Sequence, residues 1–208
     1  MSTQPSHPVE EVLPLPPMPI VMPLAVDVNS YNAQYRYKRP DAEVRCPNCN
    51  TVMTPWDSYH RHPRTRDGRI CILVYRWRCP KCGKTSGVLP DFLAPYLHHI
   101  VEVRESCVRS HLEGVTIEKA AEQAGVDVRT VSRWMARARR VLDSAVSLIS
   151  NLIARLTIMV AWPRVKVDGT KGRMFLLFDL GDVLCGATLT RGAPGVFPRI
   201  NCSNLFYL

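Results

Sequence analysis

The sequence predicts an α+β fold in which a small four-cysteine module of short antiparallel strands precedes a mainly α-helical part with a long C-terminal helix. Two Cys-x-x-Cys pairs, at 46/49 and 79/82, flank a segment rich in β-branched and aromatic residues. Downstream, residues 116–136 combine helical apolar spacing with a small residue and a glycine, placed where two helices would cross and turn. The chain of 208 residues is long enough for one ordinary domain or two small ones.

Residues 1–40 are expected to form a Pro-rich disordered tail. Seven prolines fall within the first 23 residues, where they exclude a helix or a central strand. Polyproline II structure or disorder follows from that composition, and a docking ligand for a Pro-binding domain is the alternative. No strict PxxP pattern with basic flanks favours the alternative. The same prolines interrupt any apolar stretch that a secretory signal would need.

The amino-acid composition indicates which kinds of partner and which cellular compartment to expect for the protein. Lys and Arg number 27 against 18 Asp and Glu, a formal net charge of +9 that favours polyanionic partners such as nucleic acid. The apolar run at 158–162 falls far short of the roughly 20 residues of a membrane span, so no membrane partner is expected. Eight cysteines without a secretion signal point to a reducing cytoplasm, where paired cysteines usually bind metal.

The segment 41–90 is predicted to be a zinc ribbon that holds one structural Zn²⁺ per chain. Two residues between paired cysteines let a tight turn aim both sulfurs at one point, and two such turns complete a tetrahedron. Four thiolates leave no open position for water, so the metal is expected to be structural. Two redox Cys-x-x-Cys sites are the alternative, but no βαβ pattern accompanies them. The predicted ligands are Cys46, Cys49, Cys79 and Cys82.

Residues 69–78 are predicted to form a strand of this ribbon, because β-branched and aromatic residues dominate them. Cys71 alternates with apolar residues on this strand, and Cys107 lies on an apolar helix face further along the chain. Both are therefore interpreted as core residues and not as ligands. Trp56 and Trp77 are expected to pack the thin core of the ribbon.

Positive charge is concentrated in the ribbon. Between 61 and 84 there are eight Lys or Arg and a single acid, Asp67. Asp67-Gly68 is a turn signal, so the arginines that flank it are expected at the mobile tip of a loop. Side chains at such a tip suit the phosphate backbone of DNA better than base edges. The predicted phosphate contacts are Arg61, Arg64, Arg66 and Arg69.

The segment 91–162 is predicted to be a helix-turn-helix domain. Apolar residues recur at threes and fours from 91 to 113, which predicts a first helix that Gly114 ends. Thr116 is placed to cap the next helix, and Asp127 to cap the one after it.

The helix-turn-helix itself is predicted at 116–136, which read TIEKAAEQAGVDVRTVSRWMA. Ala121 suits the point where the two helices cross, and Gly125 suits the sharp turn between them. The buried positions are expected to be Ile117, Ala120, Ala124, Val126, Val131 and Trp134. The residues that face outward at the start of the second helix are predicted to contact bases and phosphates in a DNA major groove: Arg129, Thr130, Ser132, Arg133 and Arg137.

The second helix of the motif is predicted to continue from Val128 towards Val160, until Pro163 ends it. An apolar heptad series runs from 135 to 159, and further apolar residues widen the stripe. Two interpretations stay open. The stripe forms a homodimer through the helix 135–159, or it packs against the helix at 91–113.

In combination, these motifs resemble a known family. The order CPNC, RWRCPKCGKTS, LPDFLAPY and a helix-turn-helix ending in SRWMARARR is similar to the N-terminal part of bacterial zinc-ribbon insertion-sequence transposases. The resemblance covers roughly residues 44–160 and looks closest to short transposase-like proteins. It implies binding to double-stranded DNA, a link to DNA recombination, and a place in the bacterial cytoplasm in association with the nucleoid.

Full transposases of this kind add an RNase-H-like domain whose three carboxylates hold two Mg²⁺ ions. The segment 163–208 is of uncertain structure: its first residues could mimic the first strand of that domain, with Asp168 as the first carboxylate. Residues 174–189 fit two strands or one helix. Only Asp179 and Asp182 follow as acids, too close to complete the triad, so no catalytic residue is expected in this chain.

Two function classes remain. The first is a sequence-specific DNA-binding protein of transposase-like type, acting as an accessory protein, a remnant or a small regulator, in which the ribbon contacts phosphates and the helix-turn-helix reads the major groove. The second is a DNA transposase or nuclease component whose RNase-H-like part is truncated or supplied by a partner. The incomplete set of carboxylates favours the first class.

Overall fold

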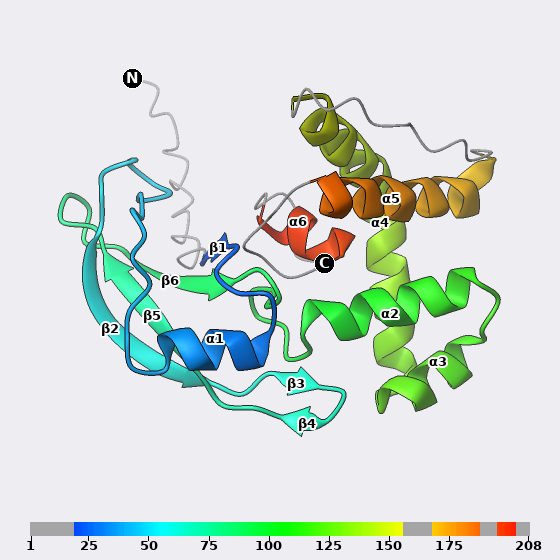
Figure 1. The fold of residues 1–208 in the computed structure, drawn as a ribbon, viewed down its shortest axis with the longest axis horizontal. Helices are drawn as coiled ribbons and strands as arrows, with labels where there is room; N and C mark the ends of the chain where they lie inside the picture. The colour runs from blue at the N-terminus through cyan, green and yellow to red at the C-terminus, as the bar shows by residue number, and fades with distance from the viewer. Residues whose placement is uncertain (1–18, 156–167, 188–194, 203–208) are drawn as a thin grey trace, which may run out of the picture.

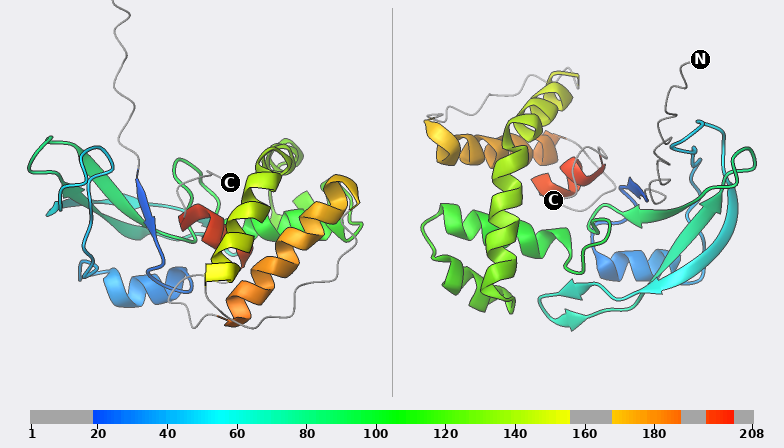
Figure 2. Two further views of the ribbon diagram at one scale, coloured as in Figure 1. Left: turned by 90° about the horizontal axis from the view of Figure 1, so that it is seen from above. Right: turned by 180° about the vertical axis from the view of Figure 1, so that it is seen from behind.

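A computed structural model of the chain describes residues 19–155, 168–187 and 195–202 (Figure 1). The strands and helix α1 gather at one end of the molecule, and helices α2 to α6 gather at the other (Figures 1 and 2). The four paired cysteines lie among the short strands, and the helical part contains the long helix α4 (Val128–Arg155). The predicted α+β fold class is confirmed.

The main sheet has four strands in the order β1-β6-β5-β2. β2 pairs with β5, and β5 with β6, in antiparallel fashion, whereas β1 lies parallel to β6. A separate hairpin of β3 and β4 turns at Arg66-Asp67, one residue before the predicted position. The strands are β1 (Ile20–Met22), β2 (Thr54–Arg61), β3 (Arg64–Thr65), β4 (Gly68–Arg69), β5 (Ile72–Arg78) and β6 (Thr85–Pro90).

The tail predicted for residues 1–40 is wrong over its second half, because β1 and α1 (Val28–Tyr35) lie there. Proline is absent between Pro23 and Pro40, so nothing in that stretch forbids a helix. The Asp27 side chain caps α1 by accepting a 2.7 Å hydrogen bond from the amide of Ser30. Tyr31 is fully buried, and its hydroxyl donates to the Leu73 carbonyl of β5. Residues 1–18 lie outside the described part of the chain.

The first helix of the helical part, α2 (Val101–Leu112), begins ten residues later than the predicted start at 91. Pro95 explains part of the difference, because proline disfavours helical backbone at the residue before it and cannot donate a hydrogen bond. Residues 91–100 instead form a loop, and its apolar side chains Phe92 and Leu93 are buried in the core. The spacing of threes and fours there does not reflect a helix, because Phe92 and Ile100 are buried in a loop and Tyr96 between them is exposed.

Both predicted helix caps of the motif are confirmed. Thr116 accepts a hydrogen bond from the Lys119 amide at the start of α3 (Ile117–Ala124). α3 ends at Gly125, whose φ of +61° lies in the left-handed region that favours glycine. Asp127 then accepts from the Arg129 amide in the first turn of α4.

Two further helices, α5 (Gly169–Ala187) and α6 (Val196–Cys202), pack beside α4 (Figure 1). Of the two alternatives for 174–189, the helix is therefore the structure as far as residue 187. α5 begins directly after Asp168, and the strand expected at 163–168 lies, up to residue 167, outside the described residues. In the described ranges, no helix combines the length and the hydropathy that a membrane span needs.

The apolar stripe of α4 is covered by helices of the same chain. It is buried against α2, α5 and α6, so the part of the stripe up to Ile153 offers no free seam for the expected homodimer. Up to Ile153 the stripe thus follows the alternative of packing against the helix at 91–113, whereas a homodimer stays a prediction and residues 156–159 lie outside the described ranges. The buried stripe residues are Met135, Ala138, Leu142, Ala145, Ile149 and Ile153.

A second core joins the sheet to the helical part. Val74 and Leu89 of the sheet pack in one cluster with Phe92 of the loop and Val103 of α2, and Trp134 of α4 lies against it. The predicted ribbon and the predicted helical domain therefore share a hydrophobic core and are not joined by a free linker.

Candidate functional site

The two Cys-x-x-Cys segments form turns of the same geometry. In the first, the Cys46 amide donates to the Thr51 carbonyl, and the Asn50 amide donates back to the Cys46 carbonyl. In the second, the Cys79 amide donates to the Lys84 carbonyl, and the Gly83 amide donates back to the Cys79 carbonyl. Asn50 and Gly83 both have left-handed backbone, with φ of +57° and +71°. Gly and Asn are the residues that adopt this conformation most readily, so each turn closes without strain.

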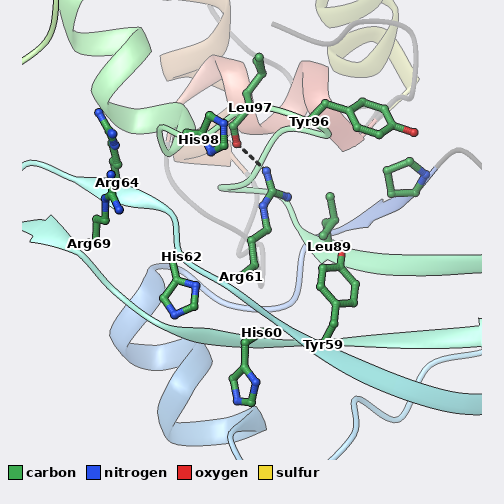
Figure 3. A pocket seen from close by; sticks show the side chains of 11 residues that line it. Tyr59, His60, Arg61, His62, Arg64, Arg69, Leu89, Tyr96, Leu97 and His98 are labelled. Atoms are coloured by element: carbon green, nitrogen blue, oxygen red, sulfur yellow. Dashed lines mark hydrogen bonds between the residues drawn. The ribbon is translucent and has the colours of Figure 1, made fainter.

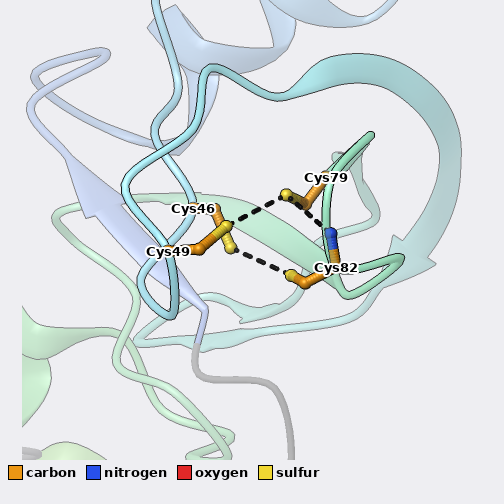
Figure 4. Close-up of side chains that lie close together, drawn as sticks. All are labelled: Cys46, Cys49, Cys79 and Cys82. Atoms are coloured by element: carbon orange, nitrogen blue, oxygen red, sulfur yellow. Dashed lines mark hydrogen bonds between the residues drawn. The ribbon is translucent and has the colours of Figure 1, made fainter.

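These turns bring the four sulfurs together (Figure 4). The Sγ atoms of Cys46 and Cys82 lie 3.5 Å apart, those of Cys49 and Cys79 lie 3.4 Å apart, and all four are within 4.8 Å of one another. A tetrahedral zinc ion with bonds of about 2.3 Å requires sulfur separations of about 3.8 Å. The cluster could therefore hold one metal ion, and its four-sulfur donor set suits zinc. Among the described residues, it contains no histidine.

Hydrogen bonds prepare one of these thiols for metal binding. The Thr51 hydroxyl lies 3.5 Å from the Cys49 sulfur, and hydrogen bonding by this residue lowers the pKa of the Cys49 thiol to about 6. The thiolate, which is the form that binds metal, is thus favoured at neutral pH.

The other two cysteines considered in the sequence lie apart from this cluster. Cys107 is buried on α2, as predicted. Cys71 is exposed, so its assignment to the core is wrong. β5 begins only at Ile72, and it is Ile72 and Val74 that face inward on this strand.

The helix-turn-helix places its predicted contact residues on the free side of α4. Ala121 and Val131 are buried together with Cys107 where α3 crosses α4, as the motif requires. Arg129 and Arg133 are exposed. Ser132 is also exposed, but its hydroxyl donates to the carbonyl of Val128 one turn earlier. Thr130 and Arg137 are half-buried.

The four predicted arginines of the ribbon differ in position and in exposure. Arg64, Arg66 and Arg69 are exposed on the β3–β4 hairpin. Arg61 is instead half-buried at the end of β2, and its Nη2 donates to the carbonyls of Ala94 and Leu97. The assignment of Arg61 to a loop tip is therefore wrong, because this side chain ties β2 to the loop at 91–100.

The hairpin is also held more firmly than a mobile tip would be. The Arg64 amide donates a 2.7 Å hydrogen bond to the His98 carbonyl, and the Ile100 amide donates to the Arg64 carbonyl. The hairpin thus extends along the loop that leads into α2, with three arginine side chains free in solvent.

Residues 46–134 match a family model described as a domain of unknown function, DUF6431. The match begins at the first cysteine of the cluster and ends at Trp134 in α4, so it spans both the sulfur cluster and the helix-turn-helix. No curated protein and no solved structure matches the chain. The match groups these two features in one module and assigns no activity to it.

On the solvent face of β2 and β5, arginine side chains lie over aromatic rings, an arrangement that was not predicted from the sequence. Trp56 is 53% exposed and lies under the Arg78 guanidinium at 4.7 Å, so its assignment to the core is wrong. Arg76 beside it pairs with Asp57, and its hydrogen bond lowers the pKa of that carboxyl. Trp77, by contrast, is buried as predicted. The alternation of β2 contains no signal for this arrangement, because almost the whole edge strand is exposed.

Proposed function

We propose that the protein binds double-stranded DNA in a sequence-specific manner, with α4 in the major groove and a structural zinc ion in the four-cysteine cluster. The observation that carries the proposal is the exposure of Arg129 and Arg133 in the first two turns of α4, next to a crossing helix that is packed through Ala121. A recognition helix reads base edges with the residues at its N-terminal end, and a bidentate arginine on guanine is the commonest such contact.

Charge supports the same proposal. The outer side of α4 continues with Arg139 and Arg140, both exposed, and the hairpin adds Arg64, Arg66 and Arg69. These side chains would contact phosphates, which fix the position of a protein on the duplex without reading sequence. The chain's net charge of +9 is consistent with such a partner.

The four-cysteine cluster supports the zinc part of the proposal. Four thiolates saturate a tetrahedral ion, so the metal would hold the ends of β2, β5 and β6 together and would not activate water. Metal binding of this kind contributes on the order of 10 kcal/mol to the folding of a small module.

No arrangement of the described residues supports the second function class, a transposase or nuclease component. Its argument was an RNase-H-like strand ending at Asp168 as the first carboxylate, and the residues of that strand before Asp168 lie outside the described part of the chain. Asp179 and Asp182, the acids that follow, lie on α5 and stand too close in the sequence to complete a triad. We therefore place the protein with the DNA-recognition part of transposase-like proteins, as an accessory protein, a remnant or a regulator.

Selection of bound sequences from a random duplex library tests this proposal. The wild-type chain should enrich a defined motif, and the double variant Arg129→Ala/Arg133→Ala should enrich none. Arg45→Ala is a matched control, because Arg45 is an exposed arginine of the first cysteine turn that pairs with Glu43. Enrichment of no motif by the wild-type chain under low-salt conditions would refute sequence-specific binding.

A further inference from the structure

A pocket of about 520 Å³ opens between β2, the β3–β4 hairpin and the loop at 91–100 (Figure 3). Among the described residues that line it there is no acid. The cationic and histidine side chains that line it are Arg61, Arg64, Arg69, His60, His62 and His98. Such a lining creates a positive potential that attracts anions.

Two tyrosines provide aromatic surface at this pocket. The Tyr59 ring rests on the sheet above Gly87, where an added Cβ would lie 3.5 Å from the tyrosine hydroxyl. Tyr96 projects from the loop on the opposite side of the pocket (Figure 3) and is 65% exposed. Its φ of +61° is a conformation that bulky residues rarely adopt, and strain of this kind is often kept at binding sites.

Arg61 brings its guanidinium to the upper edge of the pocket, beside the loop (Figure 3). Its Nη2 is occupied by two loop carbonyls. In the described part of the chain, no partner accepts a hydrogen bond from its Nε or Nη1. These donors are available to a ligand, and Arg64 and Arg69 add exposed guanidinium groups from the hairpin.

A second arginine, Arg104, is buried within electrostatic reach of Arg61, although it does not itself line the pocket. Arg104 of α2 is 1% exposed, and none of its guanidinium nitrogens has a hydrogen-bond partner among the described residues. Burial, together with the charges of Arg137 and Arg61, lowers the pKa of Arg104 to about 9. A buried cation without a partner destabilises a protein, and a nearby negative charge relieves that cost.

We propose that this pocket binds one unpaired nucleotide of a DNA strand, with its base on Tyr96 and its phosphate at Arg61 and Arg64. Aromatic rings next to a basic groove are the usual means of binding single strands, because every base offers a flat face for stacking. In a duplex both faces of a base are covered by its neighbours, so only an unpaired nucleotide can use the ring. The inference rests on the proposed function in one respect, the choice of DNA as the polymer.

The loop that lines one side of the pocket packs against α4, the proposed recognition helix. His99, in the same loop as Tyr96 and His98, packs edge-on against Trp134 of α4, with ring centroids 5.2 Å apart. A strand held in the pocket and a duplex held on α4 would therefore meet one rigid unit. Such a unit suits a junction between paired and unpaired DNA.

The test measures fluorescence anisotropy with a short labelled single-stranded oligonucleotide, an abasic strand of equal length and a duplex. The variant is Tyr96→Gly, because glycine accepts the left-handed backbone while the whole side chain, ring included, is removed. We expect Tyr96→Gly to bind the single strand about 5- to 150-fold more weakly than the wild type and the duplex equally well. Tyr96→Phe keeps the ring and should bind like the wild type. Tyr37→Ala, which removes an exposed tyrosine outside the pocket, should also have no effect.

The possible results distinguish a failure of the nucleotide pocket from a failure of the proposed function. Equal single-strand binding by Tyr96→Gly and the wild type, or equal binding of the abasic strand, would overturn the nucleotide pocket. Duplex binding without single-strand binding would also overturn it and leave the proposed function intact. Tyr96-dependent single-strand binding, together with no duplex binding and no enriched duplex motif, would refute the proposed function and support the pocket.

Discussion

The backbone amide of Phe197 donates a 2.9 Å hydrogen bond to the carboxylate of Glu105, which lies 92 residues earlier in the chain. The neighbouring amide of Val196 donates to the same carboxylate, so Glu105 of α2 holds the start of α6. Arg109, one turn along α2, pairs with Glu105 and also with Asp182 of α5. Glu105 and its partner Arg109 therefore anchor both C-terminal helices to α2, Glu105 at α6 and Arg109 at α5.

This anchor predicts a specific dependence of stability on pH. Burial raises the pKa of the Glu105 carboxyl, against the opposing effects of the amide bonds and of Arg109. A carboxyl whose pKa is higher in the folded than in the unfolded state binds its proton more tightly when folded. Its contribution to the free energy of unfolding therefore rises as the pH falls through the folded pKa towards the ordinary value of 4.5.

The measurement compares urea unfolding of the wild type and Glu105→Gln between pH 7 and 4.5. The difference in free energy of unfolding should shift in favour of the wild type as the pH falls, because the variant has no carboxyl to protonate at this site. Glu102→Gln, an exposed position on the same helix, controls for the loss of one charge. A shift in favour of Glu105→Gln would show that the carboxylate form is the one the fold prefers.

The four-cysteine cluster predicts one equivalent of tightly held zinc per chain, found by metal analysis of protein purified without added zinc. Cys46→Ser and Cys82→Ser should each lose the metal and unfold residues 44–84. Cys71→Ser is the matched control, because Cys71 is exposed outside the cluster, and it should keep both metal and fold. A Cys46–Cys49 disulfide without metal in freshly lysed reduced cells would be the contrary result.

The outward position of Arg129 and Arg133 predicts a loss of sequence preference on substitution. Arg129→Ala and Arg133→Ala should each cost about 1–3 kcal/mol at particular base pairs and little at others. Competition binding across single-base variants of the selected site measures this. A uniform loss on all sequences would mean that these side chains touch only phosphate.

The exposed hairpin arginines predict a change in salt dependence. Arg64→Ala/Arg66→Ala should weaken specific and non-specific duplex binding by similar factors and make the slope of log K against log salt shallower by roughly one to two units. Arg36→Ala/Lys38→Ala removes two exposed charges beyond the end of α1 and should leave the slope unchanged. An unchanged slope with an altered preferred sequence in Arg64→Ala/Arg66→Ala would show that the hairpin reads bases.

Features set by neighbouring residues could be predicted from the sequence. The Cys-x-x-Cys turns need only two intervening residues, and the Thr116 and Asp127 caps bind amides two or three positions away. Features set by distant contacts could not. Val21 pairs with Leu89 in a parallel ladder, and Arg61 donates a hydrogen bond to the Leu97 carbonyl 36 residues away. Neither partner can be inferred from the residues that are adjacent in the sequence.

The same distinction explains the helix that was predicted to start too early. Phe92 and Ile100 owe their place in the helical spacing at 91–100 to burial in a loop between the sheet and α2, whereas Tyr96, between them, is exposed. The pocket was missed for a similar reason. Tyr59 and Tyr96 come from separate segments that only the folded chain brings to one place.

The core shared by sheet and helices bears on how this module can be inherited or transplanted. The recurrent segment, 46–134, contains the sulfur cluster and the start of α4, but it excludes Val21 and Tyr31, which cover the sheet from one side. It also ends before Met135, the first of the buried stripe residues of α4, and excludes Met174 and Phe178, which pack in one cluster with those residues and with Leu112 of α2. The recurrent segment therefore identifies the module by its sequence but does not contain all the residues that bury its apolar faces. A lineage that fuses it to new flanks must also supply new apolar covers for both exposed faces.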